Sequence, residues 1–524
     1  MVDIMSKKSK RKSNNAALSN INGAENSALS LKNNDLFSKI NFNPSLLILL
    51  FVTLLGAYLR LHALGSESIW LDEASTFRMS NVDSISSVWA NAIQDRHPPL
   101  HFLIIHFITL FSTSEFWIRF PSAVFGILSI PAIYLTAESL FRKREGIISA
   151  FILSISVFHI FYSQEARMYS QMMFFSLLTI YFLYRSSIEN KKWLWMSFSV
   201  SSALAFYSFY YTIFVLIPIG IFYLTMQLKN SFKEKKIVIS DIGNVKQFAL
   251  SIIVFLVLIS PLIVPFISQS ISRTSDTPTW GMSQSFSFFS SILQQFSIAG
   301  TGYYLFLLFF LIGSIFMIKN IDQRDQSLLL GLLFILPFVA SFILAGKMPF
   351  SSRYLLFILP VYFIVISRGI TGVADFLFKL DTGSSKRNET NVMNLSFVVF
   401  VLFILLVLSF SSMSMYYSNP QKNDWRSTVD YLNEVSSPGD VIVFLPGYMT
   451  QPFKYYYDSD DRIIESASNS EALININSKY DSKIWYVITW DISAANPEGD
   501  ALAWLNENAV MVNQITGIYI MTNR

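Results

Sequence analysis

Titratable side chains gather in one stretch that follows the first long apolar segment. Asp72 and Glu73 form an adjacent carboxylate pair directly after Trp70. His62 lies at the end of the apolar segment, and His97 and His101 belong to the stretch itself. Partial removal from water raises the pKa of a carboxylate toward the range of a general base. The pair therefore predicts proton abstraction, with simple solvation of a polar loop as the alternative.

Arginines recur in three later segments that border apolar runs. Arg119 precedes Phe-Pro-Ser at 120–122, Glu165 and Arg167 lie within 163–171, and Arg353 precedes Tyr354. A planar guanidinium matches a pair of phosphate oxygens, which predicts anion recognition. The alternative is that these side chains reach from a span to the membrane interface. Glu165 and Arg167 are two residues apart and do not face each other on a helix, so each is expected to find another partner.

A metal site is the weaker hypothesis for the same residues. His97 and His101 are four apart, and Asp72 with Glu73 could complete an oxygen-rich site, but no spacing fixes their meeting. We expect no obligatory metal or other cofactor, with a divalent ion as the alternative. The absence of Cys excludes disulfides, Cys-ligated zinc and a thiol nucleophile. His106 and His159 lie on apolar runs and are expected to be packing residues.

The composition requires a lipid solvent. Hydrophobic residues make up 52% of the 524 residues and charged residues only 14%, which is more apolar surface than one soluble core could bury. Apolar segments near the ~20 residues of a membrane span recur about eleven times. They cover 45–64, 120–141, 147–163, 170–185, 193–211, 212–228, 247–267, 303–318, 327–345, 354–369 and 395–413. The small net charge of +4 gives nucleic acid binding no support.

Basic connectors set the predicted orientation. Lys and Arg cluster at 142–144, 185–192, 229–236, 319–324 and 379–387, and such connectors are typically cytoplasmic. This places Leu100–Phe111 in the interface, because a crossing there would move every later basic connector outside. Its dozen residues are also short for a span. The segment Phe286–Ile298 is expected to behave likewise. The outer face then holds 64–122, 163–171, 269–302 and 346–354.

The chain is predicted to have three parts. Residues 1–43 read as a disordered, basic, cytoplasmic tail. Residues 44–414 form the transmembrane catalytic domain, with a first outer loop at 65–119. Residues 415–524 form an extracytoplasmic, soluble α/β domain, because a helical pattern over Asp424–Val435 alternates with strand patterns at Val441–Leu445 and Lys483–Thr489. A Ser-Pro-Gly-Asp turn lies between the first helix and the first strand.

Four motifs together resemble a known family. They are Trp-Leu-Asp-Glu at 70–73, His-Pro-Pro-Leu-His at 97–101, Arg-Phe-Pro-Ser at 119–122 and Ser-Arg-Tyr-Leu at 352–355. Because they occur in this order and on the same predicted side of the membrane, they resemble the motifs of the GT-C fold glycosyltransferases. The branch is that of the protein O-mannosyltransferases and lipid A aminoarabinose transferases, often called glycosyltransferase family 39 and its relatives. The resemblance covers most of residues 45–370.

The resemblance implies a donor that is a polyprenyl or dolichyl phosphate carrying one sugar, with inversion at the anomeric carbon. By position, Asp72 resembles the catalytic base, Glu73 a residue that assists in placing a substrate, and His97 and Arg353 residues that meet the donor phosphate. Further members of the donor or substrate site are Arg60, His101, Arg119, Glu165, Arg167 and Tyr354. No Trp-Trp-Asp pattern is present, which disfavours transfer of a whole glycan to Asn.

The sequence thus predicts an integral protein of the cell membrane with its amino terminus in the cytoplasm. It is expected to be a hexosyl- or pentosyltransferase acting outside on a protein, lipid or glycan acceptor. A lipid-linked glycan ligase is one alternative. A polytopic lipid or polysaccharide transporter is another, although transport predicts charges buried mid-span, where this chain has few.

Overall fold

The structure, a computed structural model, describes residues 44–234, 239–275, 281–282, 284–285, 287–378, 387–459 and 461–523. The tail predicted for residues 1–43 lies outside the described residues. The chain divides into two units between Phe51 and Val52, and every helix and strand after α2 (Pro44–Leu61) belongs to the second unit.

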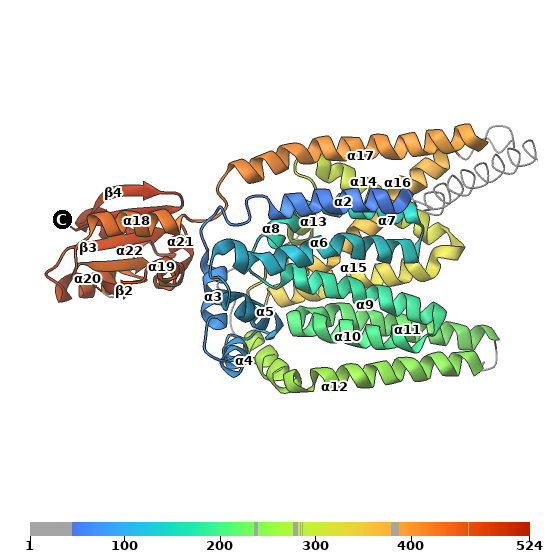
Figure 1. Cartoon of the computed structure of the whole chain (residues 1–524), viewed down its shortest axis with the longest axis horizontal. Coiled ribbons are helices and arrows are strands. Elements are labelled where there is room, and N and C mark those ends of the chain that lie inside the picture. Colours follow the sequence, from blue (N-terminus) through green and yellow to red (C-terminus); the bar gives the residue numbers. More distant parts are fainter. Residues whose placement is uncertain are drawn as a thin grey trace, which may run out of the picture. The chain divides into compact units, whose positions relative to one another are not determined.

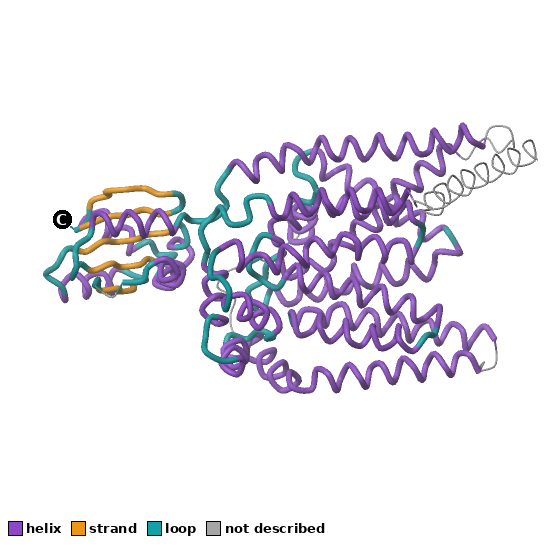
Figure 2. The backbone as a smooth tube through the Cα atoms, viewed as in Figure 1, coloured by secondary structure: helices purple, strands orange, loops and turns teal. Residues whose placement is uncertain are grey.

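Long helices occupy each of the eleven predicted apolar segments (Figures 1 and 2). They are α2 (Pro44–Leu61), α6 (Glu115–Leu140), α7 (Lys143–Ser154) with α8 (Val157–Ser163), α9 (Tyr169–Glu189), α10 (Lys192–Ser208), α11 (Ile213–Glu234), α12 (Ile239–Ser275), α14 (Thr301–Lys319), α15 (Arg324–Ala345), α16 (Leu359–Phe378) and α17 (Arg387–Ser418).

The predicted count of eleven spans is not confirmed. Among the described residues, eight helices are long and apolar enough to cross a membrane, or nine if α7 and α8, bent by 64°, form one span. Helices α9 and α10 lie where two further spans are predicted. Helix α10, with 17 residues, is too short, and in the 21-residue α9 serines and tyrosines dilute the apolar residues. The polytopic helical fold is therefore confirmed, and the count of eleven is not.

Helix α16 is the central helix of the second unit. Of its most apolar stretch, 94% is buried inside the protein, against 22% for α17. Gly313 of α14 and Gly369 of α16 allow the two backbones to meet: a Cβ on Gly313 would lie 2.1 Å from the Val365 carbonyl oxygen. Small residues at such a crossing let helices approach closely where no hydrophobic effect drives association.

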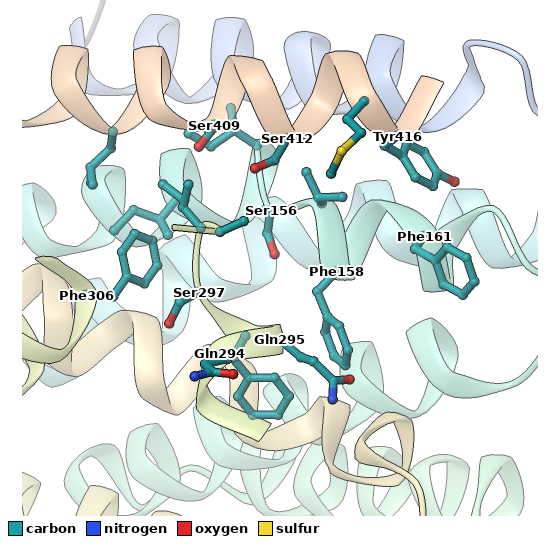
Figure 3. A pocket seen from close by; sticks show the side chains of 18 of the residues that line it. Ser156, Phe158, Phe161, Gln294, Gln295, Ser297, Phe306, Ser409, Ser412 and Tyr416 are labelled. Atoms are coloured by element: carbon teal, nitrogen blue, oxygen red, sulfur yellow. The ribbon is translucent and has the colours of Figure 1, made fainter. Parts of the chain in front are cut away.

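A cavity of about 330 Å³ lies between α7, α8, α13 (Ser287–Phe296), α14, α16 and α17 (Figure 3). Its wall is mainly apolar, including Phe158, Phe161 and Phe306, and a few amides and hydroxyls interrupt it. Helix α13 is the short helix predicted near Phe286–Ile298.

Three short helices lie between α2 and α6: α3 (Leu71–Ser80), α4 (Ile85–Gln94) and α5 (Leu100–Thr109). Helix α5 has ten residues, which confirms the short apolar helix predicted from Leu100. The imidazole Nδ1 of His106 lies 2.9 Å from the Ser80 carbonyl oxygen and joins α5 to the end of α3. His106 is thus a packing residue, as predicted.

The carboxyl-terminal residues form a five-stranded sheet in the order β2-β1-β3-β5-β4. Strands β1 (Val441–Leu445), β2 (Ile463–Ser466) and β3 (Ile484–Thr489) are parallel, and β4 (Val510–Ile515) and β5 (Ile518–Thr522) pair antiparallel. The helices of this part are α18 (Trp425–Val435), α19 (Thr450–Tyr456), α20 (Ser470–Lys479), α21 (Ile492–Ala495) and α22 (Asp500–Asn508).

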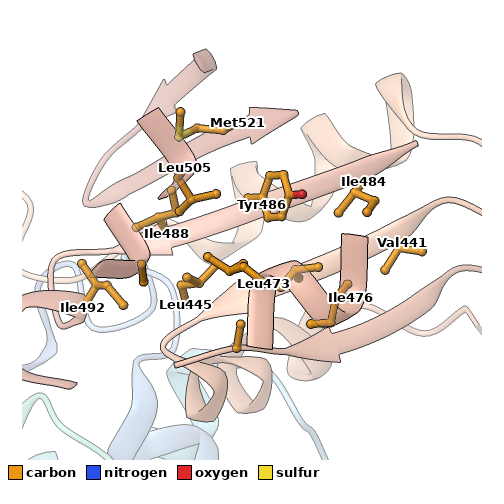
Figure 4. Close-up of a cluster of buried hydrophobic side chains, with 13 residues drawn as sticks. Val441, Leu445, Leu473, Ile476, Ile484, Tyr486, Ile488, Ile492, Leu505 and Met521 are labelled. Atoms are coloured by element: carbon orange, nitrogen blue, oxygen red, sulfur yellow. The ribbon is translucent and has the colours of Figure 1, made fainter. Parts of the chain in front are cut away.

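Both faces of this sheet are covered, so its central strands are buried along their whole length. One core contains Val441, Leu445, Tyr486 and Leu505 (Figure 4), and the other contains Trp425. The predicted helix and two predicted strands are confirmed as α18, β1 and β3. Gly439, in the predicted turn, has a φ of 88° that favours glycine. That this part is a soluble, extracytoplasmic domain stays a prediction.

Candidate active site

Asp72 and Glu73 occupy the first turn of α3, directly after Trp70. The Trp70 backbone N–H donates to Glu73 Oε2 at 3.3 Å and closes that turn. Unpaired backbone N–H groups and the helix dipole favour carboxylates at this end of a helix. The two adjacent carboxylates nevertheless point into different surroundings.

The Asp72 carboxylate pairs with Arg353, at the start of the 3-10 helix η3 (Ser352–Ile358). Arg353 Nη1 lies 2.8 Å from Asp72 Oδ2, and the Asp72 side chain keeps 24% of its surface exposed. The Arg353 guanidinium carbon lies 5.7 Å from the Trp70 ring centre, 5.5 Å from Tyr169 and 5.7 Å from Tyr354. Arg353 Nε is buried without a hydrogen-bond partner among the described residues. The arginine is thus held by aromatic faces and keeps one donor free.

The Glu73 carboxylate is completely buried and fully occupied. Arg119 donates to both of its oxygens, at 2.7 and 2.8 Å, Lys422 Nζ donates to Oε2 at 3.0 Å, and the Ala166 backbone N–H donates to Oε1 at 2.9 Å. Burial alone would raise the pKa of Glu73, but the two cations outweigh it and lower that pKa to about 2. Glu73 is therefore an ionised structural anchor with no oxygen left for a substrate.

Arg119 uses all five of its guanidinium N–H groups inside the protein. Besides Glu73, they reach the backbone oxygens of Leu64, Glu67 and Ser68 at 2.9 to 3.1 Å. These contacts fix the segment that leads into α3. That Arg119 binds the sugar donor stays a prediction. Its guanidinium has no N–H group left to contact such a ligand.

Arg60 is also turned inward. Its guanidinium donates to the carbonyl oxygens of Gly56, Leu153 and Ser154 and lies 2.6 Å from His159 Nδ1. Two of these carbonyls end α7, where backbone oxygens lack partners within the helix. Arg60 therefore stabilises the bend between α7 and α8, and its predicted contact with a donor phosphate stays without support. His159 packs there, as predicted.

Glu165 is a buried carboxylate with no hydrogen-bond partner on either oxygen among the described residues. Burial raises its pKa to about 7, although Arg353 and Lys422 pull in the other direction. Glu165 thus titrates near neutral pH, and the charges of Asp72 and Glu73 add to the rise of its pKa.

Arg167 connects the remaining predicted residues to α3. It donates to Thr76 Oγ1 at 3.0 Å and to the Asp72 carbonyl oxygen at 3.3 Å, and its Nη2 lies 3.4 Å from His97 Nε2. Its Nε is buried and has no hydrogen-bond partner in the described part of the chain. Arg167 and Arg353 therefore both contact Asp72, and each has one unused donor.

His97 and His101 have different environments. His97 Nδ1 lies 2.8 Å from the Asp95 carbonyl oxygen and 3.1 Å from its Oδ2. Burial lowers the pKa of His97, with Asp95 opposing and Arg167 adding to the effect. His101, completely buried, lies 3.2 Å from Gln171 Oε1, and burial lowers its pKa to about 4. Both imidazoles are neutral near pH 7.

The predicted residues thus divide into two sets. Asp72, His97, Glu165, Arg167, Arg353 and Tyr354 surround one polar centre, and Glu73, Arg119 and His101 support it. The Arg60 guanidinium contacts the bend between α7 and α8 instead. The cations around the centre are Arg119, Arg167, Arg353 and Lys422. The carboxylates are Asp72, Glu73, Glu165 with its pKa of about 7, and the partly exposed Asp95 beside His97. The excess of positive charge suits an anionic ligand.

Lys422 is a cation of this cluster that the sequence does not single out. It lies in the connector between α17 and α18, 349 positions from Glu73, where no motif marks it. The one sequence feature that relates Lys422 to Asp72 and Glu73 is that all three are predicted on the same side of the membrane. Tyr169 lies in the polar segment 163–171, but no sequence pattern indicates the contact of its ring with Arg353.

No group of three or more His, Asp or Glu residues that could hold a metal ion occurs among the residues the structure describes. His97 and His101 turn to Asp95 and Gln171, respectively.

Two pockets adjoin the cluster and share Phe161, Tyr416 and Gln421. One is the apolar cavity of Figure 3, where Gln295 accepts a hydrogen bond of 2.5 Å from Ser352, the neighbour of Arg353. The other, of about 320 Å³, is mainly polar and is bordered by Arg119, Lys422 and the connector. An apolar and a polar space thus meet beside the charged cluster.

Comparisons with known proteins agree with this architecture. Residues 96–264 match the family model described as dolichyl-phosphate-mannose-protein mannosyltransferase. The chain is similar to ArnT from Cupriavidus metallidurans bound to undecaprenyl phosphate, with a TM-score of 0.57 and 12% identity over 92% of this chain and 98% of that one.

It is also similar to the oligosaccharyltransferase AglB from Archaeoglobus fulgidus in complex with an inhibitory peptide and a dolichol phosphate. That TM-score is 0.55, with 12% identity over 92% of this chain and 74% of that one. A comparison with curated proteins finds no match. The predicted resemblance to the GT-C fold glycosyltransferases is confirmed.

Proposed function

We propose that this protein is an inverting glycosyltransferase that moves a single sugar from a polyprenyl or dolichyl phosphate to an acceptor on the extracytoplasmic face. The observation that carries the proposal is the partly exposed Asp72 paired with Arg353 at 2.8 Å, inside a buried cluster with excess positive charge. The fold supports it, because neighbours of the same fold were solved with undecaprenyl phosphate and with a dolichol phosphate.

Asp72 acts as the base. It takes the proton of an acceptor hydroxyl or amine while the acceptor atom forms its bond to the anomeric carbon. The bond from that carbon to the phosphate oxygen breaks, and its electron pair leaves with the lipid phosphate. No nucleotide or covalent enzyme intermediate is required, because one displacement inverts the anomeric carbon.

Arg353 and Arg167 bind the phosphate that leaves. Both contact Asp72, and the buried Nε of each is free to donate to a phosphate oxygen. Donors that are already in place before charge develops stabilise the transition state more than the ground state. Because burial raises its pKa to about 7, Glu165 carries less negative charge near neutral pH than an ordinary carboxylate, which weakens its repulsion of the phosphate.

The apolar cavity provides a place for the lipid chain. Its Gln295 contacts Ser352, so the cavity ends next to the arginine that receives the phosphate. The lining residues do not include Asp72 or Arg353, which keeps the lipid chain apart from the reacting atoms. Tyr354 packs between Tyr169, Phe209 and Tyr211 and holds the start of η3 in place.

Mass spectrometry of cells with and without this protein tests the proposal. Loss of the protein should remove one sugar from a surface glycan, lipid or protein and should leave a polyprenyl phosphate sugar accumulating. Asp72→Asn should reproduce that loss, whereas Asp83→Asn, which changes an exposed carboxylate in the same outer loop, should not.

The outcome also separates the alternatives. A lipid-linked glycan ligase would instead accumulate a polyprenyl-linked oligosaccharide. A transporter would change the side on which the lipid is found but not the number of sugars transferred.

A further inference from the structure

We propose that Lys422 is a positioning residue of the active site: its ammonium holds Glu73 and, through Glu73, the first turn of α3 that carries Asp72. The carboxyl-terminal part of the chain thereby completes the catalytic centre. This inference rests on the transferase function proposed above for Asp72.

The connector that contains Lys422 is fixed on both sides of this residue. Tyr416 donates from its hydroxyl to Gln164 Oε1 at 2.7 Å, before Lys422. After it, Asp424 Oδ1 accepts a hydrogen bond of 2.9 Å from Ser68, two residues before Trp70. Lys422 therefore reaches Glu73 from a backbone that is already attached to the segment entering α3.

The ammonium itself is enclosed. The Lys422 side chain is 7% exposed and the Glu73 side chain is fully buried, with 3.0 Å between Nζ and Oε2. Removing a charge from water is costly and is tolerated when a partner balances it. Glu73 already has Arg119 as a bidentate partner, so the second cation is not required to neutralise the carboxylate.

The additional cation acts on the geometry of α3. Glu73 is adjacent to Asp72, and its Oε2 receives both Lys422 and the Trp70 backbone N–H that closes the first turn. Without Lys422, that oxygen keeps only Arg119 and the Trp70 N–H, so the first turn of α3 loses a restraint. Asp72 then depends on Arg353 and Arg167 alone for its position. A displacement of about 1 Å at a reacting group can cost about 100-fold in rate.

Lys422 also acts through charge. Arg353 and Lys422 lower the pKa of Glu165, and Asp72 and Glu73 raise it. Arg167 and Tyr162 also interact electrostatically with Glu165. Removing the ammonium should therefore move the pH profile of transfer to higher pH. A role limited to folding would leave that profile in place.

The experiment compares Lys422→Met with Lys422→Arg, which keeps the charge, and with Lys454→Met as the matched control on an exposed lysine of α19. The full-length protein in lipid nanodiscs is used throughout. For Lys422→Met we expect kcat to fall by about 100-fold with little change in the KM for the donor. Lys422→Arg should recover most of the rate, and Lys454→Met should match the unmodified protein.

Amide hydrogen exchange gives a readout that does not require activity. Exchange across residues 70–76 should become faster in Lys422→Met only, because the first turn of α3 loses a restraint. If the exchange changes as expected but the unmodified protein transfers no sugar from any lipid phosphate donor, the proposed function fails and the positioning role stands.

Unchanged kcat and unchanged exchange in a correctly inserted Lys422→Met protein would overturn the positioning role. If Lys422→Met does not accumulate, Lys422→Gln is measured instead, because it keeps a donor for Glu73 without the charge. Failure of both variants to insert would also overturn the inference, since Lys422 would then serve the fold and not the catalytic centre.

Discussion

Glu165→Gln should stabilise the protein, and the gain should grow as the pH rises. Burial raises the pKa of Glu165 from 4.5 to about 7. A carboxyl group whose pKa is raised in the folded state contributes stability that is complete below its unfolded pKa and is lost as the pH rises through its folded pKa. At about 1.4 kcal/mol per pKa unit, the contribution lost by about pH 8 amounts to about 3 kcal/mol.

Glutamine keeps the shape of the protonated acid and does not titrate. The variant should therefore match the unmodified protein near pH 4.5 and exceed it by about 3 kcal/mol at about pH 8. Melting temperatures in detergent, followed by tryptophan fluorescence from about pH 5 to about pH 8, measure the difference across this window. Glu498→Gln, at an exposed position, is the control that should show no such trend.

A difference in melting temperature between Glu165→Gln and the unmodified protein that stays the same at every pH would refute this reasoning. It would mean that Glu165 titrates near its ordinary value, so that a partner absent from the described contacts must hold its charge.

Arg119→Met should destabilise the protein by about 3–5 kcal/mol, because Glu73 keeps only one cation and three backbone carbonyl oxygens lose their hydrogen-bond donor. Melting curves followed by tryptophan fluorescence measure the loss of stability. Arg119→Lys should restore little of it, because a lysine cannot make these contacts together. Arg353→Lys should lower kcat for sugar transfer by about 100-fold or more at normal protein levels, because a lysine lacks the donor fork for a phosphate; equal kcat values would contradict a role at the phosphate. Ser412→Trp should fill the apolar cavity and raise the KM for long polyprenyl donors more than the KM for short-chain analogues. Steady-state assays with both kinds of donor measure this difference. An equal rise in both KM values would place the lipid chain outside this cavity.

The membrane helices could be predicted because apolar runs of span length have few other solutions. The basic connectors predicted that Asp72 and Arg353, 281 positions apart, lie on the same side of the membrane, and the structure pairs them. That this side is the outer one stays a prediction. Sidedness alone could not tell which cations face a substrate. Which cations turn inward depends on where a bend or a loop leaves backbone oxygens without partners. Arg60 and Arg119 donate hydrogen bonds to such oxygens.

The distinction between Asp72 and Glu73 was also beyond the sequence. Neighbouring residues in the first turn of a helix point in directions about 100° apart, so one reaches the open centre and the other the buried cations. The cation that completes the second environment comes from the connector after α17, and no local pattern relates Lys422 to Glu73.

Transfer by the purified protein in nanodiscs is the most direct test of the central claim. The protein receives polyprenyl phosphate sugars with an isotopic label at the anomeric carbon, and the released lipid phosphate and the product anomer are measured by mass spectrometry and NMR. The predicted result is release of lipid phosphate with inversion at the labelled carbon, abolished by Asp72→Asn and preserved in Asp83→Asn. Release that continues unchanged in Asp72→Asn, or a product with retained configuration, would contradict the account.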